Sequence, residues 1–486
     1  MTKTSNLSKL KKFLPTILLI AVPAIVIILA LIFWNKPSEQ SYGDNIAEID
    51  WSNATETTLN LEKTTKITSP GVYRLTGEIS NGYLEINTSG AVKLILAGVN
   101  IANSTGPAIY VAEAKSLTVS TEEGTTNTLT DASTYQSWDE DVCGVLFSHD
   151  DLILEGSGTL IVNGNFEDGI VGKDDLKVSS GTIIINSKDD GLRGRDSVYI
   201  AGGNLTINSG GDAIKSNNTE EKGYILIDDG ALSLSADDDG VHAESLLEIN
   251  GGTIDVKKSY EGLEAAKISI NGGTIKVVSS DDGLNAAGGN DSSSPNVMNY
   301  RTQSGDYSIT INGGEIYVNS QGDGIDSNGL LYLNGGTVVV DGPSNSANGA
   351  LDAETGVIYN GGTVIAVGAS GMAVAPNNSS TKYSLSVFFT STYSAKTTLS
   401  VKDSSGSVVL SHTSTRTFNH ASLSSESFKE GETYTILIND SAYETVTLSD
   451  KTTTVGSGGM STGSFPAQNG GQGGGAQGAQ NDRFRR

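Results

Sequence analysis

The chain has 486 residues, of which 59 are glycine and 6% are aromatic, and its formal net charge is −25 at pH 7. A surface this acidic repels nucleic acids and anionic membranes and suits cations, which excludes a nucleic-acid-binding protein. The single cysteine, Cys143, excludes an intrachain disulfide.

The first predicted element is a membrane anchor. Phe13–Trp34 contains no charged residue and follows four lysines. At ~1.5 Å per residue this run spans ~33 Å as a helix, which is enough for a hydrocarbon core of ~30 Å. The pattern predicts a basic cytoplasmic end and one transmembrane helix in residues 1–35, so that the bulk of the chain is extracellular. A cleaved signal peptide is the alternative. Residues 36–53 read as a polar linker.

From about Leu152 to Met372 a short unit recurs, marked by a glycine that precedes an alternating strand. The markers are Gly158, Gly181, Gly203, Gly230, Gly252, Gly273, Gly314, Gly336 and Gly362. Their spacing gives a unit of about 22 residues with a few insertions, and a period in this range is typical of a solenoid.

Each unit contains three short runs in which apolar side chains alternate with period two. Ile183 and Ile185, Val198 and Ile200, and Leu192 after an Asp-Gly pair illustrate the three runs. Such alternation indicates strands with one set of side chains pointing inward. We therefore predict an all-β protein with a right-handed parallel β-helix over residues 54–376, irregular at its N-terminal end. A leucine-rich repeat is the alternative, but it requires Leu-dominated spacing and usually a helical segment.

Two insertions follow the Asp-Gly corner, at Ser216–Lys222 and Ala286–Asp306, and should emerge along one edge of the β-helix. After the repeats, the alternation in residues 377–450 predicts a small antiparallel β-sheet cap. Residues 451–486 are rich in Gly and Gln and too poor in apolar side chains to fold.

An acidic residue recurs near the ninth position after most markers and is usually followed by glycine, which suggests a tight corner with positive φ. This acid ladder consists of Asp168, Asp190, Asp212, Asp239, Glu261, Asp282 and Asp323. Further acids precede some of its members, at Asp189, Asp238 and Asp281. Carboxylates stacked ~4.8 Å apart repel by roughly 1 kcal/mol in water. All ten acids are therefore candidate Ca²⁺ ligands, since hard cations prefer oxygen donors. The alternative is a solvated Asp-Gly turn that the backbone requires.

Three residues beyond the ladder, the outward position varies in charge. Its occupants are Arg193, Lys215, His242, Glu264, Asn285 and Asp326. In a lyase, Lys215 or Arg193 would abstract the proton α to a uronate carboxylate. Charge balance for the ladder is the alternative. The outward tyrosines Tyr199, Tyr317 and Tyr332 would either stack on sugar rings or simply favour β-structure.

Several ordered motifs carry a family resemblance. They are Asn127-Thr-Leu-Thr-Asp, Gly156-Ser-Gly-Thr-Leu-Ile-Val-Asn-Gly, Asp168-Gly-Ile-Val-Gly-Lys-Asp-Asp-Leu-Lys-Val and Gly211-Asp-Ala-Ile-Lys-Ser. With them the chain resembles the bacterial carbohydrate-binding domain-containing family from roughly Ile46 to Ser449. The resemblance implies a β-helix similar to pectate-type polysaccharide lyases, extracellular binding of plant-type polysaccharide, calcium on the coil corners and no established catalytic role. The chain departs from the repeat at Asp212-Ala213 and Asn348-Gly349.

The sequence thus predicts a monomeric, membrane-anchored, calcium-binding protein that holds acidic or plant-type polysaccharide, such as pectin or cellulose, without catalysis. The alternatives are a calcium-dependent lyase acting on uronates and a surface adhesin or spacer without a glycan ligand.

Overall fold

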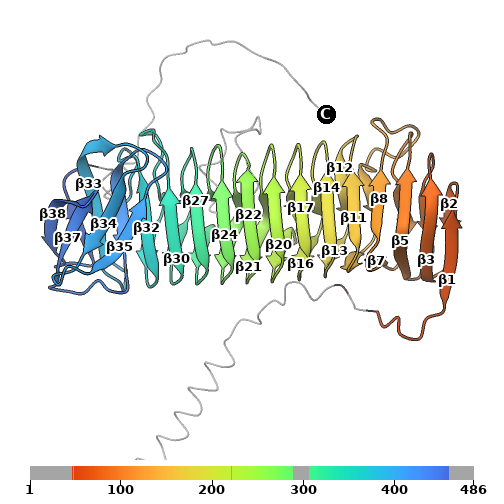
Figure 1. Ribbon diagram of the computed structural model, residues 1–486, viewed down its shortest axis with the longest axis horizontal. Helices are drawn as coiled ribbons and strands as arrows, with labels where there is room; N and C mark the ends of the chain where they lie inside the picture. Colours follow the sequence, from red (N-terminus) through yellow and green to blue (C-terminus); the bar gives the residue numbers. More distant parts are fainter. Residues whose placement is uncertain (1–45, 47–48, 221, 288–305, 459–486) are drawn as a thin grey trace, which may run out of the picture.

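The computed structural model describes residue 46 and residues 49–220, 222–287 and 306–458. The regular structure of these residues is all β: a right-handed parallel β-helix, followed by a cap at its C-terminal end (Figure 1). No helix in these ranges is long and apolar enough to cross a membrane. The predicted anchor, most of the loop Ala286–Asp306 and the tail beyond residue 458 lie outside the described residues.

The β-helix has three faces, as predicted, because each coil contributes three short strands. The first face contains β7 (Leu117–Thr121), β10 (Leu152–Gly156), β13 (Asp175–Val178), β16 (Ser197–Ile200), β19 (Tyr224–Ile227), β26 (Ser308–Ile311), β29 (Leu330–Leu333) and β31 (Gly356–Tyr359). The second contains β8 (Thr126–Thr130), β11 (Thr159–Asn163), β14 (Thr182–Asn186), β17 (Asn204–Asn208), β20 (Ala231–Ser235), β22 (Thr253–Lys258), β24 (Thr274–Val278), β27 (Glu315–Asn319), β30 (Thr337–Asp341) and β32 (Thr363–Gly368). The third contains β2 (Thr65–Ile67), β4 (Leu84–Asn87), β6 (Ile109–Glu113), β9 (Gly144–Ser148), β12 (Asp168–Gly172), β15 (Leu192–Gly194), β18 (Ile214–Ser216), β25 (Leu284–Ala286) and β28 (Ile325–Ser327).

Longer strands join or begin these faces. β21 (Val241–Ile249) and β23 (Leu263–Ile270) run from the third face into the first of the next coil. At the N-terminal end, β1 (Glu56–Leu61), β3 (Gly71–Ile79) and β5 (Val92–Ala102) pair in parallel, and β5 also pairs in parallel with β7 and with β8. These first coils are less regular than the rest, in agreement with their looser sequence spacing.

Equivalent residues of successive coils stack in register. In β14 and β17, Ile183 lies beside Leu205 and Ile185 beside Ile207, and all four side chains are buried. Burying an aliphatic side chain of this size stabilises the fold by ~1.5–3 kcal/mol. The core is therefore a continuous column of aliphatic side chains along the axis of the β-helix, which each coil completes for its neighbours.

Steric crowding explains why glycine recurs at the marker positions. Gly252 has φ +81, and a Cβ at this position would lie 2.8 Å from the carbonyl oxygen of Gly230 in the preceding coil. A side chain would therefore both strain the backbone and separate the coils.

The cap is a pair of sheets with its own hydrophobic core. In one sheet, β36 (Phe418–Ser424) pairs antiparallel with β32 and with β33 (Ser384–Tyr393). The other is antiparallel throughout, in the order β35 (Val408–Thr413), β34 (Thr398–Lys402), β37 (Thr433–Ile438) and β38 (Ser441–Thr447). The predicted antiparallel cap is confirmed. β39 (Thr452–Val455) lies beyond its predicted end at residue 450 and pairs in parallel with β33.

Candidate functional site

The third face carries two columns of charged side chains that run along the β-helix. The acid ladder occupies the corner between the second and third faces, where Asp168 begins β12 and the other members lie just before β15, β18 and their equivalents. Beside it, successive strands align the outward residues in register. This outward column consists of Arg193, Lys215, His242, Glu264, Asn285 and Asp326.

The ladder carboxylates tie one coil to the next. The backbone N–H of Asp190 donates to Oδ1 of Asp168 at 3.0 Å, and that of Asp212 donates to Oδ1 of Asp190 at 3.0 Å. Asp239 and Glu261 continue the pattern, with donor–acceptor distances of 2.9 and 3.1 Å. One oxygen of each of these aspartates thus accepts a hydrogen bond from the backbone of the next coil. This supports the alternative that the acid recurs because the backbone requires it.

The glycine after the ladder acid has a different role from the one predicted. Gly191, Gly240 and Gly262 do not have a positive φ. A Cβ on Gly191 would instead collide with the side chain of Ile207 and the backbone of Ala213 in the next coil. Close packing of the coils requires glycine here, and the prediction of a positive φ was wrong.

In the first half of the ladder, the second carboxylate oxygen faces a basic group. Nη2 of Arg193 lies 2.6 Å from Oδ2 of Asp168, and Nζ of Lys215 lies 2.6 Å from Oδ2 of Asp212. Burial lowers the pKa of Lys215, but the Asp190 and Asp212 carboxylates raise it by more, so that the net pKa lies above the ordinary value. This geometry favours charge balance over a role as base, because a general base must be deprotonated.

His242 is the last basic residue of the outward column. Its Nδ1 lies 3.1 Å from Oδ2 of Asp239 and 2.8 Å from Oε2 of Glu264. Burial lowers the pKa of this imidazole, and the two carboxylates raise it by more, to well above its usual range. His242 therefore acts as a cation between two acids.

In the second half, carboxylates gather in two groups, and His242 is the one residue of the outward column that supplies a basic group to them. Oxygens of Asp282, Asp323 and Asp326 lie within 4.8 Å of one another, as do oxygens of Asp239, Glu261 and Glu264. Burial, together with the neighbouring acids Glu264 and Asp239, raises the pKa of Glu261 to about 10. Burial likewise raises the pKa of Asp282 to about 8 and that of Asp326 to about 7. A bound cation would relieve the repulsion between the acids of each group.

Two buried oxygens at this place receive no hydrogen bond from the described residues. Asn285 is 6% exposed and donates from Nδ2 to Oε2 of Glu261 at 2.7 Å, but its Oδ1 has no partner among them. Oε1 of Glu264, a residue with no exposed surface, also has none. Buried polar atoms are normally satisfied, and a bound cation is one group that would satisfy both oxygens.

The remaining predicted site residues lie elsewhere. Asp189 is exposed and Asp238 and Asp281 are half-buried, and none of them joins a described group of acidic oxygens within 4.8 Å of one another. The hydroxyls of Tyr199 and Tyr317 donate to Asp228 and Asp341, respectively.

A second acidic group was not predicted. Oxygens of Asp151, Asp174 and Asp175 lie within 4.8 Å of one another, at the opposite edge of the third face. Nζ of Lys222, at the end of the first insertion, lies 2.7 Å from Oδ2 of Asp196 and 3.7 Å from both Asp174 and Asp175. The insertion thus supplies a positive charge to this acidic group. The sequence contains a signal for the group, because Asp151 and Asp175 occupy equivalent positions in successive repeats.

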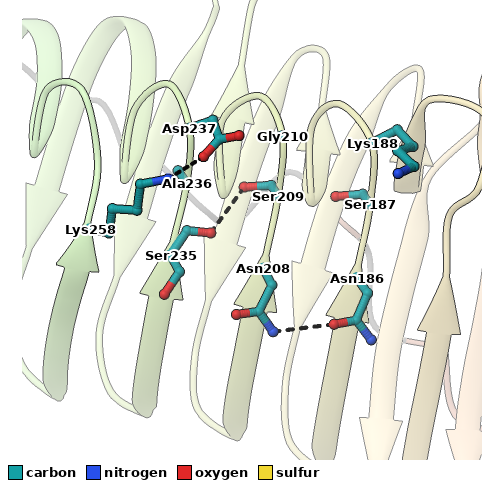
Figure 2. A pocket seen from close by; sticks show the side chains of 10 residues that line it. All are labelled: Asn186, Ser187, Lys188, Asn208, Ser209, Gly210, Ser235, Ala236, Asp237 and Lys258. Carbon is teal, nitrogen blue, oxygen red and sulfur yellow. Dashed lines mark hydrogen bonds and ion pairs between the residues drawn. The ribbon is translucent and has the colours of Figure 1, made fainter.

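A polar groove of about 530 Å³ lies on the other side of the ladder, where the second face ends (Figure 2). It is lined by Asn186, Ser187, Lys188, Asn208, Ser209, Gly210, Ser235, Ala236, Asp237 and Lys258. Nδ2 of Asn208 donates to Oδ1 of Asn186 at 3.2 Å, and Lys258 pairs with Asp237. The lining crosses four coils and presents amides, hydroxyls and ammonium groups, which are groups that hydrogen-bond to sugar hydroxyls.

A parallel β-helix with a polar groove along one corner belongs to the class of solenoid proteins, which present extended surfaces. A family model described as "Carbohydrate-binding domain-containing protein" matches residues 61–298. A relative with the same description, from Acetivibrio thermocellus, is 40% identical over 240 residues, which cover 47% of this chain and 83% of the relative. The chain belongs to this carbohydrate-binding domain-containing family, as its motifs predicted.

One solved structure is also similar, that of a polysaccharide lyase-like protein from C. thermocellum in a gadolinium derivative. It is 31% identical, and the match covers 47% of this chain and 95% of the other with a TM-score of 0.40.

Proposed function

We propose that the protein binds acidic or plant-type polysaccharide, such as pectin or cellulose, in the polar groove beside the acid ladder. The groove carries the proposal, because its amides and hydroxyls recur from coil to coil and can follow the sugars of a linear chain. Lys188 is exposed at one end and could contact a uronate carboxylate. Family membership supports carbohydrate as the class of ligand.

Calcium is part of the proposal. Carboxylate and amide oxygens are the donors that Ca²⁺ prefers, and the unpartnered oxygens of Glu264 and Asn285 fit such an ion. Bound there or at Asp282, Asp323 and Asp326, it would neutralise buried acids and hold neighbouring coils together. We further propose that the N-terminal segment anchors the protein in the cell membrane, with the β-helix outside the cell.

Binding without catalysis is the better-supported activity. In a lyase, Lys215 or Arg193 would need to lose a proton, yet both are paired with ladder carboxylates. Neither faces the described groove, which the second face and its corner enclose.

Retention of the purified protein on polygalacturonate and cellulose, with Ca²⁺ at about 1 mM or with chelator, tests the proposal. We expect retention on at least one glycan, weakened severalfold by Lys188→Ala. Lys115→Ala is the matched control, since Lys115 is exposed on a different corner and has no ion pair among the described residues. Absence of retention on every glycan would favour a spacer or adhesin. Calcium-dependent absorbance of unsaturated product, lost in Lys215→Ala, would show a lyase instead.

A further inference from the structure

The basic residues of the outward column fill the gaps between ladder carboxylates. The guanidinium of Arg193 lies 2.6 Å from Asp168 and 3.9 Å from Asp190, which belong to successive coils. The ammonium of Lys215 lies 3.5 Å from Asp190 and 2.6 Å from Asp212. Each of these side chains therefore neutralises two rungs, which is the geometry of an ion bound between coils.

The same place is filled differently further along. His242 stands in register with Glu264, and Glu264 in register with Asn285. From Glu264 onward the described column offers oxygen in place of basic nitrogen. Beside Glu261, Glu264 and Asn285 add two buried oxygens that have no hydrogen-bond partner among the described residues. A cation bound between them would satisfy these oxygens and balance the charge of the two acids.

We propose that the residue type in the outward column determines, for each coil, whether a basic side chain or a bound divalent cation neutralises the ladder carboxylates. In the first half of the ladder, the neutralising groups are the side chains of Arg193, Lys215 and His242. In the second half, Glu261, Glu264 and Asn285 hold a hard divalent cation. This inference rests on the proposed calcium binding and adds to it the position of the ion. It also assigns Lys215 a role as a fixed counter-ion.

The charges of the two halves support this division. In the first half, Arg193, Lys215 and His242 offset most of the charge of the four ladder acids there, which are Asp168, Asp190, Asp212 and Asp239. Beside Asn285, oxygens of Glu261 and Glu264 lie within 4.8 Å of an Asp239 oxygen, and among the described residues only the imidazolium of His242 opposes their charge. Buried like charges at such distances repel strongly, and one doubly charged ion compensates for them where a second basic side chain is lacking.

Reciprocal exchanges test the proposal on the purified full-length protein after chelation. Asn285→Lys places an ammonium where the ion would lie. We expect its melting temperature in chelator to exceed that of the unmodified protein, and its Ca²⁺ affinity by calorimetry to fall about 10-fold or more. Asn271→Lys is the control, because Asn271 is an exposed amide away from the ladder.

Lys215→Gln removes a built-in cation. We expect a lower melting temperature in chelator, recovery of most of the loss on addition of Ca²⁺, and one additional ion per chain in the titration. Asp190→Asn, in the neutralised half, should leave the Ca²⁺ affinity within about 2-fold of the unmodified protein, since single-site effects away from a ligand set are small.

The inference is overturned if Asn285→Lys keeps the full calcium response, or if Asp190→Asn abolishes it. A protein that binds glycan but no Ca²⁺ would overturn the inference and leave the proposed carbohydrate binding standing. If Ca²⁺ binding follows the expected pattern but no glycan retains the protein, this inference stands and the proposed carbohydrate binding fails.

Discussion

In this β-helix, the residue type at many positions is determined by contacts with the next coil rather than by contacts within the same coil. Asp190 is buried because its carboxylate accepts the N–H of Asp212, and Gly191 is a glycine because Ile207 fills the space of a side chain. The repeat period revealed these positions, since equivalent residues meet in space. It could not reveal which carboxylates are neutralised, because this depends on side-chain contacts between two columns.

His420 gives a prediction at this scale. It is 2% exposed, its Nε2 lies 3.0 Å from the hydroxyl oxygen of Ser386, and burial lowers its pKa to about 4. The unfolded chain has an ordinary pKa near ~6.5 and binds the proton first on acidification. The native fold should therefore lose about 3 kcal/mol of stability through this group as the pH falls from 7 to 4.

Urea unfolding at pH 7 and pH 4 measures this loss, and His420→Gln should reduce it by that amount. The half-exposed His149 provides the control, since His149→Gln should retain the loss of the unmodified protein. An equal acid sensitivity of His420→Gln and the unmodified protein would contradict the prediction.

At the scale of elements, the junction between the β-helix and its cap depends on the last residue of β30. Asp341 is fully buried and accepts hydrogen bonds from His412, Ser414 and Thr415 of the cap at 2.6–3.0 Å. The hydroxyl of Tyr317, on β27, adds another at 2.9 Å. Burial raises the pKa of Asp341, but the bonds from His412 and Thr415 lower it by more, to about 2. This carboxylate thus fastens the cap to the last coils.

Asp341→Asn should destabilise the junction by about 3 kcal/mol, because an amide directs its own N–H groups at donors that the carboxylate had satisfied. Proteolysis is expected to cut the cap near Thr415 in this variant before the β-helix. Asp403→Asn is the control, since Asp403 is exposed and bonds within its own turn. Unchanged stability and proteolysis would show that the cap is held by its apolar contacts alone.

The strands of the β-helix could be predicted because each repeats the inward pattern of its neighbour. The presence of an antiparallel cap could be predicted from the change in alternation. Its attachment could not, because Asp341 meets residues 71 to 74 positions later and no local pattern links them. The same limit applies to the polar groove, which forms only when Asn186, Asn208 and Ser235 from three coils are aligned.

At the scale of the whole molecule, the β-helix should tolerate the loss of one complete coil. Removal of residues 181–202 joins Ser180 to Gly203, and β17 then replaces β14 with its inward residues in register. We expect a folded, shorter protein with a cooperative melting transition in circular dichroism. Removal of residues 181–201 leaves one residue too many, which turns the apolar side chains of the following strand outward. If both deletion variants melt cooperatively, the expectation that the coils must stack in a fixed register is wrong.

The antiparallel pairing of β36 with β32 has a consequence for assembly. A parallel coil ends in a row of free N–H and C=O groups that could template the next coil, either of this chain or of a second molecule. By presenting a strand of reversed direction, the cap occupies that row along Val364–Gly368 and closes the template. At the C-terminal end of the second face, the described structure therefore leaves no parallel edge on which a further coil of this chain or of a second molecule could pair.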